Sequence, residues 1–141
     1  MPTPVEPAAD LLATLERATV FALGAEGFAA VISPELAAYR KLAPRVRELG
    51  DALRALVTSA SPAGRIYAAL LLGELDPAAG RAAWTQLQAS RDGLMFHPGG
   101  CHVRISAVLG EIAADALEVG IDEAVVRATQ RWRAIHVPPP R

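Results

Sequence analysis

SPAGRIYAALLLGELDP, residues 61–77, is the stretch that decides the fold class. Ser61-Pro62 and Asp76-Pro77 each place a helix-capping side chain directly before a proline, as Ser33-Pro34 does earlier in the chain. The capping oxygen accepts a backbone N–H that would otherwise lack a partner, and a proline in the first helical turn has no N–H to leave unpaired. Each of the three pairs therefore predicts the start of a helix.

Between two of these starts, Ile66 to Leu72 is apolar without interruption. A helix that is apolar on all sides has to be covered on all sides, so residues 62–74 are expected to form the central and most buried helix. Helical spacing of apolar residues predicts the other helices at residues 8–23, 34–42, 44–57, 77–89, 103–118 and 122–134, the last with Asp122 as its cap. We therefore expect an all-α fold, with about six or seven short helices in a compact array or bundle.

The chain of 141 residues has room for one domain, which we place at residues 8–135 between proline-rich tails at 1–7 and 136–141. A net charge of −1 argues against a nucleic-acid or anionic-lipid partner. The sole cysteine, Cys101, excludes an intrachain disulfide, and no apolar run approaches the ~20 residues that span a bilayer. A single lysine among many arginines, with much Ala, Gly and Pro, points to a GC-rich bacterial genome. We expect a cytoplasmic bacterial protein.

The tetrad Leu72-Gly73-Glu74-Leu75 recurs 37 residues later as Leu109-Gly110-Glu111-Ile112. The segment from Arg65 to Pro77 resembles the HEAT-type helical repeat of the short, bacterial, phycobilisome-lyase-like kind. In that family an arginine leads a helix, small residues follow, and Leu-Gly precedes an Asp-Pro turn. A second copy from Val103 lacks the Asp-Pro turn, and its arginine-to-leucine interval is shorter. The resemblance implies stacked helix pairs that bind another protein along their surface.

The strongest candidate for chemistry is the set His97, Cys101 and His102 on a glycine-bearing stretch. Imidazole and thiolate groups could hold Zn²⁺, with Asp92 or His136 as a distant further ligand, or Cys101 could be a nucleophile activated by histidine. The alternative is a Pro-Gly-Gly turn with Cys101 buried as a small apolar side chain, and we prefer it. No sequence motif of a nucleotide site, zinc protease or serine hydrolase is present. We therefore expect no metal and no other cofactor.

Residues 90–102 include residue types that favour turns, and we expect a structured loop in preference to a hairpin between 94–96 and 103–105. Arg91, Met95, Phe96 and His97 combine apolar anchors with a polar border, which suits a partner-binding surface. The alternative is that Met95 and Phe96 turn inward and close one end of the core.

The charged residues near the C-terminus form an acidic group and a basic group, and each group has two possible interpretations. Glu111, Asp115 and Glu118 lie at helical spacing and are interpreted as a solvated face in preference to an acid/base pair. Arg127, Arg131 and Arg133, with Trp132, could bind a phosphate or an acidic partner, but cations also favour a solvated last helical turn.

Taken together, the sequence predicts a non-catalytic protein-interaction module that binds another protein or a second copy of itself. The alternative is a metal- or thiol-dependent enzyme centred on His97, Cys101 and His102.

Overall fold

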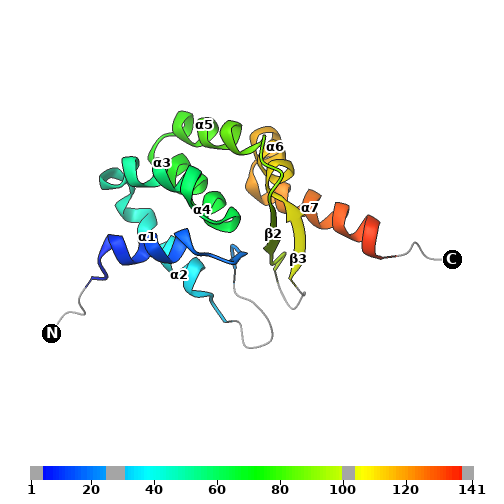
Figure 1. Ribbon diagram of the computed structural model, residues 1–141, viewed down its shortest axis with the longest axis horizontal. Coiled ribbons are helices and arrows are strands. Elements are labelled where there is room, and N and C mark those ends of the chain that lie inside the picture. Colours follow the sequence, from blue (N-terminus) through cyan, green and yellow to red (C-terminus); the bar gives the residue numbers. More distant parts are fainter. Residues whose placement is uncertain (1–4, 25–30, 100–103, 138–141) are drawn as a thin grey trace.

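A computed structural model describes residues 5–24, 31–99 and 104–137 of the chain (Figure 1). Within these ranges the chain is mainly helical, with seven α-helices, one 3₁₀ helix and three short strands. In order they are α1 (Ala8–Glu16), β1 (Val20–Phe21), α2 (Pro34–Leu42), η1 (Ala43–Glu48), α3 (Gly50–Ser59), α4 (Pro62–Leu75), α5 (Pro77–Leu87), β2 (Gly93–Phe96), β3 (Ile105–Val108), α6 (Leu109–Val119) and α7 (Ile121–His136). A search of the described helices for one long and apolar enough to cross a bilayer found none.

The three helix starts predicted from a capping residue before proline are confirmed. In each pair the side-chain oxygen accepts a backbone N–H from the first helical turn: Ser33 from Leu36 at 3.1 Å, Ser61 from Gly64 at 3.2 Å and Asp76 from Ala78 at 3.1 Å. The prediction that Asp122 caps the last helix is wrong. That helix begins at Ile121, directly after Gly120, whose φ of 88° is a conformation that glycine adopts readily.

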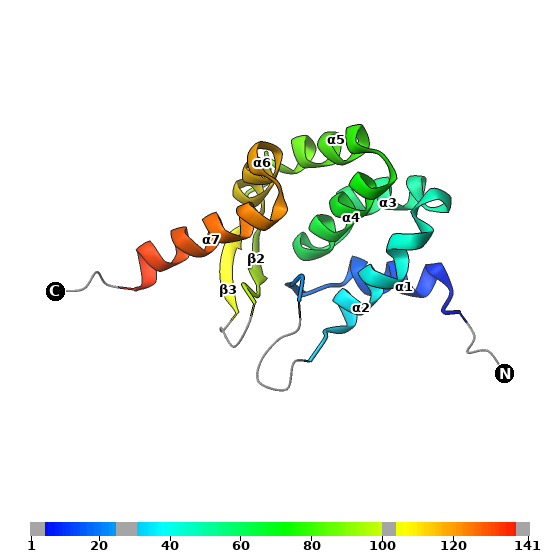
Figure 2. The ribbon, with the colours of Figure 1, turned by 180° about the vertical axis from the view of Figure 1, so that it is seen from behind.

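Helix α4 is the central helix, as its sequence predicts. Six of the seven side chains from Ile66 to Leu72 are buried and the seventh, Leu70, is half-buried. The helix contacts α1, α2, α3, α5 and α6 as well as strands β1 and β2. The ribbon views from the front and from behind place it between the N-terminal helices and the sheet (Figures 1 and 2).

Three of the predicted helices differ from the observed ones by more than about two residues at a boundary. The helix expected over 8–23 ends at Glu16 because Ser61, directly before α4, binds the backbone carbonyls at that point. The Ser61 N–H donates to the Glu16 carbonyl at 2.8 Å, and the Ser61 hydroxyl donates to the Ala18 carbonyl at 2.6 Å. The helix expected over 44–57 is split into η1 and α3 at Leu49, whose φ of −119° and ψ of 8° are not helical. The helix expected over 103–118 begins only at Leu109, because the preceding residues form β3.

The hairpin between β2 and β3 corrects the prediction of a structured loop over 90–102. Strand β2 pairs antiparallel with β3, from Gly93 opposite Val108 to Phe96 opposite Ile105, and β1 joins the other edge of β2 in parallel. In the β2–β3 hairpin the two faces differ in burial. Leu94, Phe96 and Ile105 are buried and Ala107 half-buried on one face, whereas Gly93, Met95 and Ser106 on the opposite face are exposed.

The two copies of the Leu-Gly-Glu tetrad make different contacts. The first ends α4, where Gly73 lies against Gly80 of α5 so closely that a Cβ added to Gly80 would come within 2.6 Å of the Gly73 Cα. The second begins α6, where a Cβ on Gly110 would lie 2.6 Å from the Gln88 carbonyl oxygen. The close approach thus requires glycine at Gly80 in the first place and at Gly110 in the second, and the tetrads lie at opposite ends of their helices.

Candidate functional site

The four residues predicted to bind a partner separate into buried and exposed pairs. Phe96 is fully buried and His97 is 6% exposed, so neither side chain is available to a partner. Phe96 instead faces the core, as the alternative interpretation expected. Met95 is 40% exposed on the open face of the sheet, and Arg91 is exposed just before β2. The predicted patch is therefore not one continuous surface, because the alternation of side chains along β2 sends its two apolar members to opposite faces.

The candidate metal or thiol site is only partly described, since Cys101 and His102 lie outside the described residues. His97 is described, and its buried ring accepts a hydrogen bond at Nδ1 from the Gly99 N–H at 3.1 Å. Its backbone N–H donates to the Phe21 carbonyl at 2.8 Å, which continues the pairing of β1 with β2. Across the described ranges no group of three or more His, Cys, Asp or Glu side chains is placed to hold a metal ion.

The two suggested distant ligands have other contacts. Asp92 pairs with Arg65 at 3.4 Å, and the His136 ring stacks on Trp132 with centroids 4.7 Å apart. Asp92 thus forms an ion pair and His136 an aromatic stack with other described residues.

The acidic residues of α6 and the arginines of α7 bind one another. Asp115, with a side chain only 15% exposed, contacts Arg131 at 2.6 Å and Arg127 at 3.2 Å. Glu118 adds a 3.2 Å contact to Arg127, and Glu111 a 3.1 Å contact to Arg131. The hydrogen bonds that Arg127 donates to Asp115 and, second in effect, to Glu118 raise the pKa of Arg127 above its usual value. Glu111 and Glu118 are exposed, as the interpretation of a solvated face expects, but Asp115 is not. Arg127 and Arg131 hold α7 against α6.

Strand β3 forms an edge of the three-stranded sheet, with β2 as its one neighbouring strand in the part of the chain that is described. The Leu109 N–H donates to the backbone carbonyl of Asp92 across this pair at 2.9 Å. Because every second residue of a strand directs its backbone groups to the same side, those of Ala107 and Ile105 also face β2. The backbone N–H groups of Ser106 and Val108 and the carbonyl of Ser106 then face the open edge. An open edge of this kind is a template for pairing with another chain.

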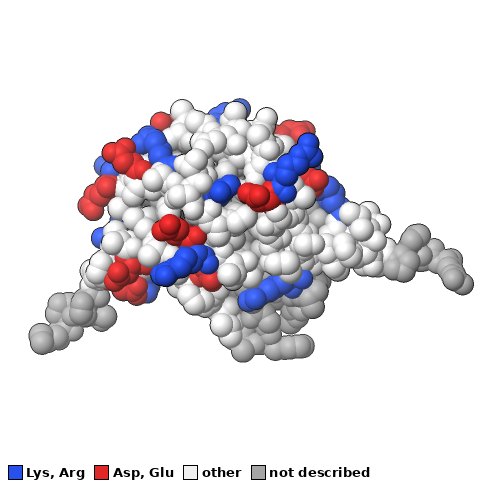
Figure 3. Space-filling view, in the orientation of Figure 1, with Lys and Arg blue, Asp and Glu red and all other residues white. Residues whose placement is uncertain are grey.

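Helix α7 carries an apolar stripe that continues past the core. Ala124 and Ala128 are buried and Trp132 is half-buried, but Ile135, one turn further along the same side, is 79% exposed. The second half of α7 extends beyond β3 on the side away from β2 (Figures 1 and 2). Its projecting end presents an uncharged surface in the view of Figure 3, whereas charges of both signs are scattered over the body.

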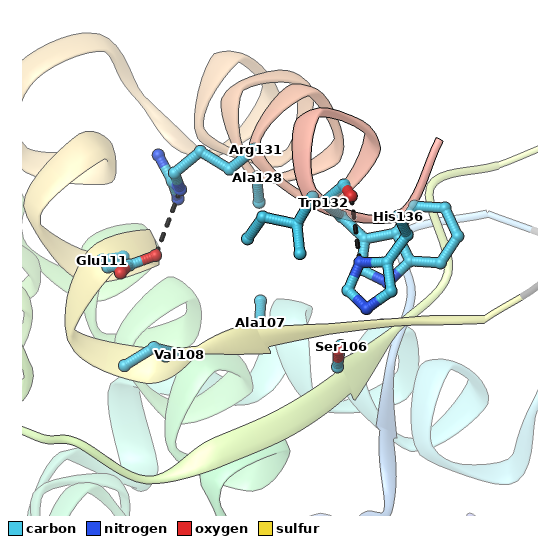
Figure 4. A pocket seen from close by; sticks show the side chains of 9 residues that line it. Ser106, Ala107, Val108, Glu111, Ala128, Arg131, Trp132 and His136 are labelled. Carbon is cyan, nitrogen blue, oxygen red and sulfur yellow. Dashed lines mark hydrogen bonds and ion pairs between the residues drawn. The ribbon is translucent and has the colours of Figure 1, made fainter. Parts of the chain in front are cut away.

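A groove lies between the projecting part of α7 and strand β3. It has a volume of about 350 Å³. We call it the α7–β3 groove and define it by the residues that line it: Ser106, Ala107 and Val108 of β3, Glu111 of α6, and Ala128, Arg131, Trp132, Ile135 and His136 of α7. Figure 4 shows Ala107 pointing toward α7 across the groove and Trp132 and His136 at its far end. The groove thus combines apolar side chains with the open backbone edge of β3.

Sequence reasoning missed this groove, although one signal for it exists. Ala128, Trp132 and Ile135 have the spacing of one helix face, which marks an apolar stripe reaching the end of α7. Nothing in the local sequence says that the core stops at Trp132 or that a strand edge lies beneath the stripe.

No protein-family model, no curated protein and no solved structure matches this chain.

Proposed function

We propose that this protein is a non-catalytic protein-interaction module of the bacterial cytoplasm, and that the α7–β3 groove is its binding surface. The observation that carries the proposal is that an exposed apolar side chain and an open strand edge lie at the same place. An apolar helix stripe ends in an Ile135 that is 79% exposed, and it lies over a strand edge that pairs on one side only among the described residues. A polypeptide bound there would gain both apolar burial and backbone hydrogen bonds.

A second hollow is less suited to a protein partner. It has a volume of about 430 Å³ between α3, α4 and α5, and it is lined by alanines and the buried Val57 and Leu72, with Arg54, Asp76 and Gln86 as polar residues. It offers no exposed large apolar side chain to anchor a partner and no open strand edge. Anchors of that kind supply most of the binding energy in protein interfaces.

The resemblance of residues 65–77 to HEAT-type repeats supports the same class of function, since that family implies protein binding by stacked helices. We include a stacked-helix origin for this fold in the proposal. The helix pairs α3–α4, α4–α5 and α6–α7 are in contact, which is compatible with such an origin. A metal- or thiol-dependent enzyme is the second candidate, but no observation among the described residues favours it.

Site-specific photo-crosslinking in cells of the encoding organism tests the proposal. The photoreactive residue p-benzoylphenylalanine is placed at position 135 or, as a control, at position 5, where the natural side chains are 79% and 78% exposed. We expect a covalent adduct with a polypeptide from position 135 and none from position 5. Equal labelling at both positions, or no adduct from position 135, would contradict the proposed binding surface.

A further inference from the structure

We propose that the occupant of the α7–β3 groove is a second copy of this chain, which joins β3 antiparallel to β3 of its partner and makes one continuous sheet through a symmetric dimer. This inference rests on the proposed function, because it names the partner of the same surface. The dimer places the projecting end of each α7 over the strand that the other copy contributes.

The open edge of β3 is complementary to itself. Ser106 presents both its N–H and its carbonyl there, and Val108 presents its N–H, as the register of β2 and β3 requires. Antiparallel pairing about a two-fold axis lets a residue that presents both groups exchange bonds with its own counterpart. Isologous contacts of this kind close after two copies, because the β3 edge of each copy is then paired.

The short length of β3 and the projection of α7 beyond it favour a partner that supplies both a strand and a helix. The described β3 spans only Ile105 to Val108, so backbone bonds alone give a small interface. The end of α7, which presents no charge on the face seen in Figure 3, passes beyond that edge (Figure 1), with Ile135 exposed and Trp132 half-buried. A second copy supplies a matching strand and a matching apolar helix end together, whereas an isolated extended segment supplies only a strand.

The charges of α7 also suit two antiparallel copies. Its first turn carries Asp122 and Glu123, and its last turn carries Arg133 and His136. Two α7 helices that run in opposite directions bring unlike ends toward one another, and parallel helices bring like ends together. A net charge of −1 per chain adds little repulsion between copies.

Sedimentation velocity of the purified full chain over a wide concentration range tests the proposal. We expect a reversible monomer–dimer equilibrium with a dimer of twice the 14.8 kDa chain mass. Ile135→Asp removes the apolar helix end and should weaken dimerisation by about tenfold to a hundredfold. Ser106→Pro removes an N–H from the open edge and leaves the bonds to β2 in place, so it should weaken the dimer as well.

Val5→Asp is the matched control, since it makes the same charge change at a side chain 78% exposed near the other end of the chain. It should leave the equilibrium unchanged, and unchanged circular dichroism spectra should show that all three variants fold. A monomer at every concentration, or a dimer that neither groove variant weakens, would overturn the second-copy proposal.

The crosslinking experiment separates this failure from failure of the proposed function. An adduct of position 135 with another copy of the chain agrees with the dimer. An adduct with a different polypeptide overturns the dimer but retains the binding surface. No adduct overturns both.

Discussion

The phenolic oxygen of Tyr67 satisfies both backbone groups of Ala22. It accepts the Ala22 N–H at 2.9 Å and donates to the Ala22 carbonyl at 2.8 Å, and both residues are buried. Through this pair the central helix α4 holds the chain directly after β1. Because β1 pairs with β2, the contact also fixes the sheet against the helices.

Tyr67→Phe should therefore destabilise the fold by about 2–4 kcal/mol, since one buried N–H and one buried carbonyl lose their partner. The ring itself remains, with its contact to Phe21 at a centroid distance of 5.0 Å. Urea denaturation measures the loss. As a control, Tyr39→Phe deletes a hydroxyl from a half-buried ring and should cost less. Equal losses at the two tyrosines would contradict this account of Tyr67.

The crossing of α4 and α5 predicts opposite outcomes for two glycines. A Cβ on Gly80 would lie 2.6 Å from the Gly73 Cα, whereas a Cβ on Gly73 meets the Gly80 Cα at an ordinary 3.9 Å. Gly80→Ala should force the helices apart and cost about 1–3 kcal/mol, as overpacking does. Gly73→Ala should be neutral or stabilise by up to about 1 kcal/mol through helix propensity. Thermal denaturation of the pair checks the asymmetry, and the reverse order of melting temperatures would refute it.

Adjacent residues of β2 should respond very differently to truncation. Phe96 is fully buried, so Phe96→Ala should cost about 3–5 kcal/mol of stability. Met95 is 40% exposed on the open face, and Met95→Ala should cost about 1 kcal/mol or less. Chemical denaturation midpoints of the two variants measure this difference. A Phe96→Ala protein as stable as the parent would mean that this side chain does not fill the core.

Two acids of α6 should contribute unequally to the attachment of α7. Asp115→Ala removes a 15%-exposed carboxylate that binds two arginines, and should cost about 1–3 kcal/mol. Glu118→Ala removes a 68%-exposed carboxylate and should cost less than about 1 kcal/mol. Melting temperatures at low and high salt measure both effects, and a larger loss for Glu118 than for Asp115 would disagree with the observed burial.

Helix starts could be predicted from the sequence because their determinants are local. A capping oxygen at Ser33, Ser61 or Asp76 acts within the following turn, and the proline next to it acts at the same place. The central position of α4 also follows from its own residues, since no side of it is polar enough for water.

The hairpin of β2 and β3 is a local pairing that the sequence left as an alternative to a loop, whereas β1 could not be predicted because its cause lies far away in the chain. Val20 and Phe21 become a strand only through pairing with Met95 and Phe96, and two-residue strands have no periodicity to detect. The groove is a product of the same distant pairings. Ile135 has the spacing of a core residue, and its exposure follows from where β3 ends and α7 continues.

Residue-resolved amide hydrogen exchange of the full chain across a dilution series tests the central claim most directly. Ala107 and Ile105 face β2, so their amides should exchange at rates that do not depend on protein concentration. Ser106 and Val108 face the open edge, and their amides should become protected as the concentration rises and a second copy covers that edge. If all four amides of β3 exchange at the same rates at every concentration, the open edge of β3 is not the self-pairing surface of this protein.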